Sequence, residues 1–212
     1  MEAQFWHKKW KNRELGFHQE TTNRFLETYI SHLAIPEGGR VFIPLCGKTL
    51  DAVWLLSKGY SVVGAELSED AIREFFDELG VKPEISVCGK LKCYSADGID
   101  MYVGDIFDLT AQQLGPVDAI YDRAALVALP EAMRTSYARH LIGITSGASQ
   151  LLISFEYDQS VMPGPPFRVD SDEINRLYNS NYAIQQLDSD AVEGGLKGIC
   201  PAEEVTWLLE RQ

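Results

Sequence analysis

FIPLCGKTLD, residues 42–51, is the segment from which the fold class of this chain is best read. The run RVFIPLCG holds six apolar residues in eight and ends in Gly47, a pattern that predicts a buried β-strand followed by a turn. Leu50 and Val53 then recur at helical spacing, and Gly59 is well placed to end that helix. The segment therefore predicts a buried strand followed by a helix, the repeating unit of an α/β fold.

The same alternation of apolar runs and amphipathic stretches continues along the chain. Ser68 is placed to cap a helix that Gly80 ends, and Pro130 stands where another helix begins. Cys88 and Cys93 flank GKLK, which predicts a tight turn. Strands that alternate with helices indicate a parallel sheet with right-handed crossovers, here with an antiparallel edge at the end. Besides the first strand, we expect strands in SVVGAEL (61–67), VDAIYD (117–122), SQLLISFEYD (149–158), NYAIQQLD (181–188) and EVTWLLE (204–210), and DMYVGDIFDL (100–109) is expected to be a strand that runs into a loop.

The composition is that of an ordinary globular protein. Of the 212 residues, 45% are hydrophobic and 24% charged, and no repeat or linker interrupts the pattern. We therefore expect one domain over 1–212, with 1–36 as an N-terminal helical extension. Lys and Arg total 19 against 31 Asp and Glu, a formal charge of -12 that argues against a nucleic-acid partner. No apolar run has the length of a signal peptide or a membrane span, and the four cysteines form no Cys-x-x-Cys pair, so we expect a cytoplasmic protein with reduced thiols, no membrane partner and no metal site.

Gly47-Lys48-Thr49 matches the last three letters of a phosphate-binding loop, but the rest of that motif is missing. The pattern GxxxxGK[ST] needs a glycine five residues before Gly47, and Phe42 stands there. The dinucleotide fingerprint G-x-G-x-x-G also fails, because Gly47 is the only glycine of the segment. The sequence therefore disfavours a nucleotide-phosphate site and a nicotinamide enzyme.

Glu66 ends the second expected strand, 19 residues after Gly47. A carboxylate at this place suits the two ribose hydroxyls of an adenosine-type ligand, although a surface glutamate in a strand-to-helix turn would have the same spacing. A ligand with adenosine, a methionine tail and no phosphate fits these facts, and S-adenosylmethionine is that ligand; its carboxylate can use amides near a helix N-terminus. Asp105, just beyond the third strand, would then lie near the adenine, or would simply cap a turn.

These segments together resemble the thiopurine S-methyltransferases, particularly their short bacterial forms. The resemblance is carried by FWHKKW, GFHQE, VFIPLCGKTLD, SVVGAELSE, VGDIFDL, YDRAALVAL and PGPPF, which keep their order from Phe5 to Arg168. It implies the class I methyltransferase fold, a Rossmann-like three-layer α/β sandwich whose seven-stranded sheet is parallel except for its last strand, with 1–36 as a helical cap over the cofactor site. The implied activity is methyl transfer from S-adenosylmethionine to the thiol of thiopurines and other aromatic heterocyclic thiols. The family also includes bacterial members linked to methylation of selenium and tellurium compounds.

The resemblance also implies site residues. Arg123 is the expected catalytic residue, because a guanidinium can favour the anionic acceptor or orient its ring nitrogens. Some family members carry a second arginine in the last third, but here no arginine lies between Arg176 and Arg211, and Lys197 is the cation of that stretch. Cofactor contacts are implied for the positions matching Trp10, Leu45, Gly47, Glu66, Asp105, Ile106 and Arg123, and acceptor contacts for those matching Phe17, Arg123, Pro165 and Pro166.

Each assignment has a plainer alternative. Trp10 and Phe17 could simply anchor an N-terminal helix, Arg123 could pair with Asp122, and His18 is left unassigned. The alternative functions are S-adenosylmethionine-dependent methylation of another acceptor, such as nucleic acid or a catechol-type oxygen, and a non-catalytic module that binds S-adenosylmethionine. Displacement at a sulfonium methyl needs alignment rather than a metal. We therefore expect a monomer that binds S-adenosylmethionine and a small-molecule acceptor.

Overall fold

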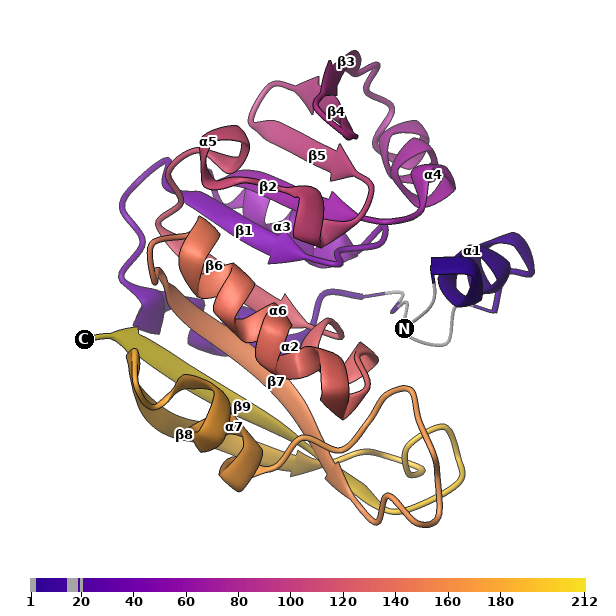
Figure 1. Cartoon of the computed structure of the whole chain (residues 1–212), viewed down its shortest axis with the longest axis vertical. Coiled ribbons are helices and arrows are strands. Elements are labelled where there is room, and N and C mark those ends of the chain that lie inside the picture. The colour runs from indigo at the N-terminus through magenta and orange to yellow at the C-terminus, as the bar shows by residue number, and fades with distance from the viewer. Residues whose placement is uncertain (1–2, 15–18, 20) are drawn as a thin grey trace.

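The computed structural model describes residues 3–14, 19 and 21–212. Within them, the centre of the fold is a nine-stranded sheet with the order β3-β4-β5-β2-β1-β6-β7-β9-β8 (Figure 1). The strands are Arg40–Pro44 (β1), Ser61–Glu66 (β2), Glu84–Cys88 (β3), Leu91–Ala96 (β4), Ile99–Val103 (β5), Ala119–Arg123 (β6), Ser149–Tyr157 (β7), Tyr182–Ala191 (β8) and Ala202–Arg211 (β9).

Seven of these strands form the predicted sheet. Neighbours in the series β5, β2, β1, β6 and β7 are parallel, β9 is antiparallel to β7, and β8 pairs antiparallel with β9. The predicted fold class is therefore confirmed, including the antiparallel last strand.

The predicted strand number of seven is wrong, because the hairpin β3–β4 extends the sheet at the β5 edge. The tight turn expected between Cys88 and Cys93 exists and joins these two strands. Ile85 and Val87 of β3 are 59% and 79% exposed. The alternation of apolar and polar residues spans only Ile85 and Val87 in β3 and only Leu91 and Cys93 in β4, which is too short a pattern to predict a strand by itself.

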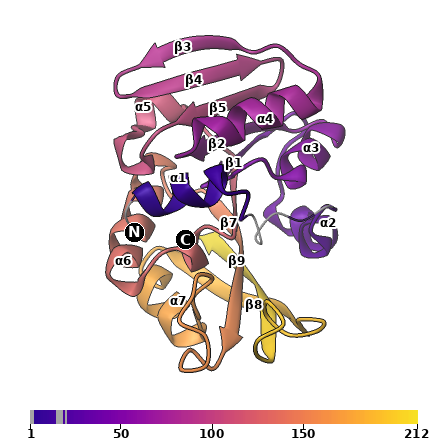
Figure 2. The same cartoon turned by 90° about the vertical axis from the view of Figure 1, so that its right-hand side faces the viewer.

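Helices cover both faces of the sheet, which gives three layers (Figures 1 and 2). One buried cluster joins α5, α6 and α7 to one face, and a second joins α2, η1, α3 and α4 to the other. The helices are Ala3–Lys11 (α1), Arg24–Tyr29 (α2), Leu50–Ser57 (α3), Glu69–Leu79 (α4), Ala111–Leu114 (α5), Glu131–Ile144 (α6) and Ser171–Tyr178 (α7), with short 3-10 turns Ile30–Leu33 (η1), Ile106–Asp108 (η2) and Leu126–Ala128 (η3).

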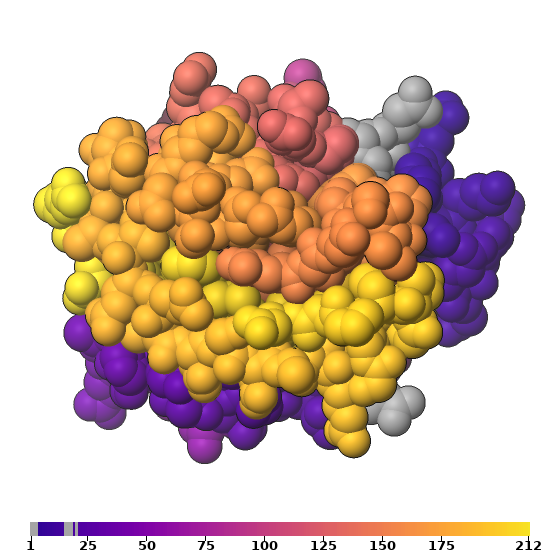
Figure 3. All heavy atoms as spheres, turned by 90° about the horizontal axis from the view of Figure 1, so that it is seen from below, coloured from indigo at the N-terminus to yellow at the C-terminus, as the bar shows by residue number. Residues whose placement is uncertain are grey.

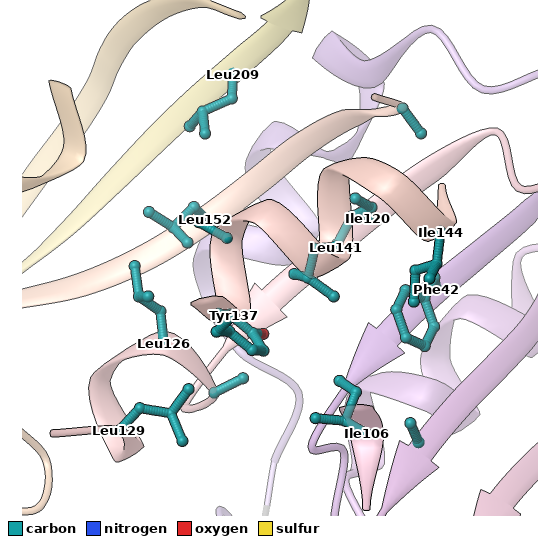
Figure 4. Close-up of a cluster of buried hydrophobic side chains, with 14 of the residues drawn as sticks. Phe42, Ile106, Ile120, Leu126, Leu129, Tyr137, Leu141, Ile144, Leu152 and Leu209 are labelled. Carbon is teal, nitrogen blue, oxygen red and sulfur yellow. The ribbon is translucent and has the colours of Figure 1, made fainter. Parts of the chain in front are cut away.

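Successive residues of the central strands enter the two clusters alternately. In β1, Phe42 belongs to the cluster under α6, whereas Val41 and Ile43 belong to the opposite one. Figure 4 shows Phe42 beside Ile144, with Leu141 one turn earlier on α6. Because both faces are covered, β1 is apolar at nearly every position, and this explains the continuous run from which the fold was predicted.

The predicted helix ends are confirmed. The Ser68 hydroxyl accepts a hydrogen bond from the amide of Ala71, and Gly80 ends α4 with a left-handed φ of 69°. Helix α6 begins directly after Pro130. The Thr49 hydroxyl caps α3 by accepting from the amide of Asp51.

The first and last parts of the chain lie at different edges of the sheet. Figures 1 and 2 show α1 beyond the carboxyl ends of β1 and β2, where it covers that edge. Figure 3 shows that the end of the molecule opposite the β3–β4 hairpin is formed largely by the last third of the chain, in orange to yellow. None of the helices in the described part of the chain has the length and apolar character needed to cross a bilayer.

Candidate functional site

Two cavities open at the carboxyl edge of the parallel strands and share one wall. The inner cavity lies against the residues that follow β1, β2, β5 and β6, and the outer cavity lies between α1, β6 and the loops after β7 and β8. The residues that line both cavities are Trp6, Arg123, Ala124 and Ala128.

The turn after β1 forms the floor of the inner cavity. Leu45 and Gly47 both have a left-handed backbone, with φ values of 46° and 57°. A non-glycine residue in this region costs about 1–3 kcal/mol, and such strain concentrates at functional sites. Lys48 turns away toward α4, where its ammonium pairs with Glu74 at 3.0 Å and Glu78 at 2.6 Å.

Glu66 holds this turn from the end of β2. Its side chain is 6% exposed and lines the inner cavity. One carboxylate oxygen accepts from the amide of Gly47 and the other from the amide of Ser68, each at 2.8 Å. Burial raises the pKa of Glu66, against the lowering effect of these amides. Since each carboxylate oxygen can accept a second hydrogen bond, Glu66 is a fixed acceptor for a pair of donors.

Asp105 and Ile106 follow β5 on the opposite side of the inner cavity. The exposed carboxylate of Asp105 caps η2 by accepting from the amide of Phe107 at 3.0 Å, so the turn-cap alternative is confirmed for Asp105. Ile106 is 6% exposed and adds an apolar wall. The preceding Gly104 has a φ of 142°, and a Cβ there would lie 2.5 Å from Leu91 Cδ2, so glycine is required at this turn.

Arg123 ends β6 on the wall between the two cavities. The alternative of an ion pair with Asp122 is not realised, because Asp122 is fully buried and accepts from the Tyr137 hydroxyl at 2.7 Å and the Leu126 amide at 3.0 Å. The Arg123 guanidinium instead interacts electrostatically with the Glu204 carboxylate and the Tyr121 hydroxyl. Ala124 follows with a left-handed φ of 59°, which makes this the second strained junction of the site.

The outer cavity has a proline wall and a charged rim. Pro165 and Pro166 line it, and their carbonyls are held by the Lys197 ammonium at 2.5 Å and the Tyr157 hydroxyl at 2.6 Å. Burial lowers the pKa of Lys197, and the nearby Lys9 lowers it further. The remaining lining includes Phe5, Lys9, Glu14, Val127, Phe155, Leu196 and Glu204.

A chain of buried hydrogen bonds links the two cavities. Asp51, 1% exposed, accepts from the Tyr121 hydroxyl at 3.0 Å and from the amide of Asn23 at 2.8 Å. The Asn23 side-chain amide donates to Glu204 at 3.4 Å. Asp51 and Tyr121 line the inner cavity, and Glu204 lines the outer one.

Most of the predicted site residues lie together. Trp10, Leu45, Gly47, Glu66, Asp105, Ile106 and Arg123 line the inner cavity, and Arg123, Pro165 and Pro166 line the outer one. Phe17 and His18 lie outside the described residues. Contact of any of these residues with a ligand stays a prediction.

Sequence reasoning missed several lining residues. Trp6 precedes Trp10 by four positions on α1, and that helical spacing was a usable signal for a shared face. Asp51, Tyr121 and Glu204 carry no local signal, because only folding brings α3, β6 and β9 together.

Among residues 3–14, 19 and 21–212, no group of three or more His, Cys, Asp or Glu side chains is placed to hold a metal ion. The lining residues offer buried hydrogen-bond acceptors, apolar walls and the guanidinium of Arg123.

Comparisons with known proteins agree with this architecture. The family model described as thiopurine S-methyltransferase matches residues 1–212. The chain is 51% identical to a thiopurine S-methyltransferase of Xanthobacter autotrophicus over 212 residues, which is 100% of both chains. It is also 51% identical to one of Teredinibacter turnerae over 211 residues, which is 100% of this chain and 98% of the relative.

Solved structures agree on the fold. A crystal structure of the Burkholderia thailandensis 1,6-didemethyltoxoflavin-N1-methyltransferase, with bound 1,6-didemethyltoxoflavin and S-adenosylhomocysteine, superposes with a TM-score of 0.65 at 14% identity and covers 99% of this chain and 87% of that one. The fold, the shared wall of the two cavities and these matches lead to one conclusion: the chain belongs to the thiopurine S-methyltransferase family and is an S-adenosylmethionine-dependent methyltransferase.

Proposed function

We propose that this enzyme methylates the sulfur of thiopurines and related aromatic heterocyclic thiols, with selenium and tellurium compounds as a second acceptor class. The observation that carries the proposal is the wall formed by Arg123 and Ala124, which both cavities share at the carboxyl end of β6. A donor in the inner cavity and an acceptor in the outer one would meet at this wall. Membership of the family supports sulfur as the methylated atom.

The residues of the inner cavity fit S-adenosylmethionine. Glu66 keeps free acceptor capacity on two oxygens that the amides of Gly47 and Ser68 already orient, which suits the two ribose hydroxyls. When bound, S-adenosylmethionine supplies a methyl group on a positively charged sulfur, which a soft nucleophile displaces. The residues proposed to hold it are Trp10, Leu45, Gly47, Glu66, Asp105, Ile106 and Arg123.

The outer cavity suits a flat, partly anionic acceptor. Pro165 and Pro166 have restricted φ and carbonyls held by neighbouring side chains, so they form a wall that loses little entropy when a ring packs on it. We propose that Arg123 stabilises the thiolate form and aligns it, since a guanidinium lowers the pKa of an adjacent acid. Phe17 is proposed as a further acceptor contact.

Three further statements belong to the same proposal. The chain acts as one domain over 1–212, with 1–36 as the cap of the cofactor site; Trp6 and Trp10, which line the inner cavity, support this. It works as a monomer in the cytoplasm. Its acceptor is a small molecule rather than a nucleic acid, which the formal charge of -12 supports.

The proposal is tested by radiolabelled methyl transfer from S-adenosylmethionine to a panel of heterocyclic thiols, selenite, tellurite and phenols, with and without chelator. We expect turnover of the thiols and of the soft anions, unaffected by chelator. Turnover of phenols alone would replace the acceptor class. Cofactor binding in calorimetry without turnover of any acceptor would indicate a non-catalytic binding module.

The variant Arg123→Ala tests whether Arg123, on the wall that the two cavities share, stabilises and aligns the thiolate. Because a hydrogen bond to a charged group contributes about 1–3 kcal/mol, we expect kcat/KM for thiols to fall about 5- to 150-fold. Arg139→Ala is the control, since Arg139 is an exposed arginine on α6 and its removal changes net charge equally. Equal kinetics of the two variants would remove Arg123 from the site.

A further inference from the structure

Glu204 is a carboxylate of the outer cavity whose role the proposed function leaves open. It is half-buried on β9, opposite Phe155 of β7, and both side chains line the outer cavity together with Arg123. The side-chain amide of Asn23 donates to one of its oxygens at 3.4 Å. Since Asn23 is itself 3% exposed and caps α2, this contact holds one carboxylate oxygen in a defined place.

The charges around Glu204 come from several elements. Arg123 of β6 and Arg24 of α2 stabilise its ionised form, while Asp51 of α3 opposes it. Arg24 is itself paired with Asp190 of β8. Across the cavity lie Lys9, which pairs with Glu14, and Lys197. Burial is the largest influence, and it raises the pKa of Glu204 above its ordinary value.

We propose that Glu204 is a second catalytic residue, the base that removes the proton of a neutral thiol or thione acceptor bound beside Arg123. The inference rests on the proposed thiol acceptor and adds to it the route of the proton. In this site the Arg123 guanidinium stabilises the developing thiolate. The Glu204 carboxylate takes the proton that the acceptor loses as the thiolate forms. If either Arg123 or Glu204 were missing, the enzyme would methylate efficiently only those acceptors that are already ionised in solution.

In a thiol acceptor the sulfur–hydrogen bond breaks and its electron pair stays on sulfur; in a thione the ring nitrogen–hydrogen bond breaks and its pair delocalises onto the exocyclic sulfur. In both cases the proton goes to a Glu204 oxygen. The sulfur forms a bond to the methyl carbon, and the bond from that carbon to the donor sulfur breaks with its pair going to the donor. Glu204 then releases the proton to water when the product leaves, so no oxidant, reductant or metal takes part.

The environment of Glu204 suits this role. A base is most effective when its pKa approaches the working pH, and burial moves a carboxylate in that direction. The charge of Arg123 opposes the effect of burial on the pKa of Glu204 and favours the ionised carboxylate. A role limited to neutralising Arg123 would need neither the fixed oxygen nor access to the cavity, and it predicts different kinetics.

The test is Glu204→Gln, which keeps shape and the hydrogen bond from Asn23 but removes the base. Glu203→Gln is the matched control, because Glu203 is the exposed neighbour on β9 and accepts from the Ser189 hydroxyl at 2.7 Å outside both cavities. Both variants are compared with wild type on thiols whose solution pKa values lie above and below the assay pH, and thermal melts check folding.

For thiols that are protonated at the assay pH, we expect Glu204→Gln to lower kcat/KM by roughly 10²- to 10⁴-fold, the usual contribution of a general base. For thiols already ionised, it should match or exceed wild type. Its pH profile for protonated thiols should follow the ionisation of the free thiol, and Glu203→Gln should behave as wild type. An equal loss across all thiols would overturn the inference and leave the proposed function standing; wild type inactive on every thiol would overturn both.

A binding measurement gives a readout that does not depend on turnover. An ionised aromatic thiol is titrated into enzyme saturated with S-adenosylhomocysteine, in buffers of different ionisation enthalpy, to count the protons taken up. We expect uptake of close to one proton for wild type and for Glu203→Gln, because Glu204 protonates beside the anion, and none for Glu204→Gln. No uptake by wild type would overturn the inference.

Discussion

The carboxylate of Glu66 accepts a hydrogen bond from the amide of Gly47 at 2.8 Å, which ties the end of β2 to the turn after β1. Its second oxygen accepts from Ser68, so both oxygens are oriented by backbone donors before any ligand arrives. Leu45, in the same turn, has a left-handed backbone. Glu66 therefore has two functions at once: it holds a strained turn and presents a fixed acceptor to the inner cavity.

This relationship predicts that Glu66→Gln weakens cofactor binding. The glutamine NH2 group would face either the Gly47 amide or the Ser68 amide, donor against donor, and the negative charge for the ribose contact would be lost. At about 1.5–3 kcal/mol for a charge-assisted hydrogen bond, Kd for S-adenosylhomocysteine should rise about 10- to 150-fold in calorimetry. Glu37→Gln, an exposed glutamate before β1, should bind as wild type. Unchanged affinity in Glu66→Gln would exclude the ribose contact.

Asp122 predicts a pH dependence of stability. Burial raises its pKa from 3.8 to about 6 in the folded protein. The folded state therefore holds the proton more tightly than the unfolded state, so this group's contribution is fully present below about pH 3.8 and is lost as pH rises through about 6. That change corresponds to on the order of 3 kcal/mol.

The measurement is urea unfolding of wild type and Asp122→Asn between pH 4 and pH 8. The variant cannot ionise, so the free energy of unfolding of wild type should fall relative to the variant as pH rises across this window. Asp97→Asn, in an exposed turn, controls for the other carboxyl groups. A wild-type-minus-variant difference that stays constant with pH would contradict the assignment.

Gly104 and Gly143 should respond oppositely to alanine. At Gly104, the backbone is left-handed and a Cβ would meet Leu91 at 2.5 Å, so Gly104→Ala should lower the free energy of unfolding by about 1–3 kcal/mol. It should also weaken S-adenosylhomocysteine binding, because Asp105 and Ile106 follow directly. Gly143 lies within α6 with open space around it, and Gly143→Ala should stabilise by about 0.5–1 kcal/mol. Thermal and urea unfolding measure the free energy of unfolding of both variants. An equal loss of stability in Gly104→Ala and Gly143→Ala would contradict the left-handed backbone assigned to the turn at Gly104.

Lys197 should set the preference for anionic acceptors. Its ammonium holds the Pro165 carbonyl at the rim of the outer cavity, and removing it also removes a positive charge from that cavity. We expect Lys197→Met to raise KM for ionised thiols about twofold to tenfold with little change in kcat, since a partly exposed charged contact contributes about 0.5–1.5 kcal/mol. Lys82→Met, on the exposed loop before β3, is the control. An equal rise of KM for neutral and ionised acceptors would show that Lys197 only stabilises the conformation of the loop that holds Pro165.

Much of the fold was predictable because its signals are local. The apolar run through Phe42 arises from burial on both faces, and the ends of α4 follow from the hydroxyl of Ser68 and the backbone freedom of Gly80. The β3–β4 hairpin was missed because the alternation of apolar and polar residues is short in both strands, for example only Ile85 and Val87 in β3.

For the site, the sequence by itself determined which residues end each parallel strand, and hence that Glu66, Asp105 and Arg123 would gather at one edge of the sheet. Only the tertiary structure decided what faces them. Glu204 lies 81 positions after Arg123 and lines the same cavity because β9 inserts beside β7, and Asp51 reaches Tyr121 because α3 packs on that face. Such contacts depend on strand order and on the packing of distant elements, and neither leaves a periodic trace in the local sequence.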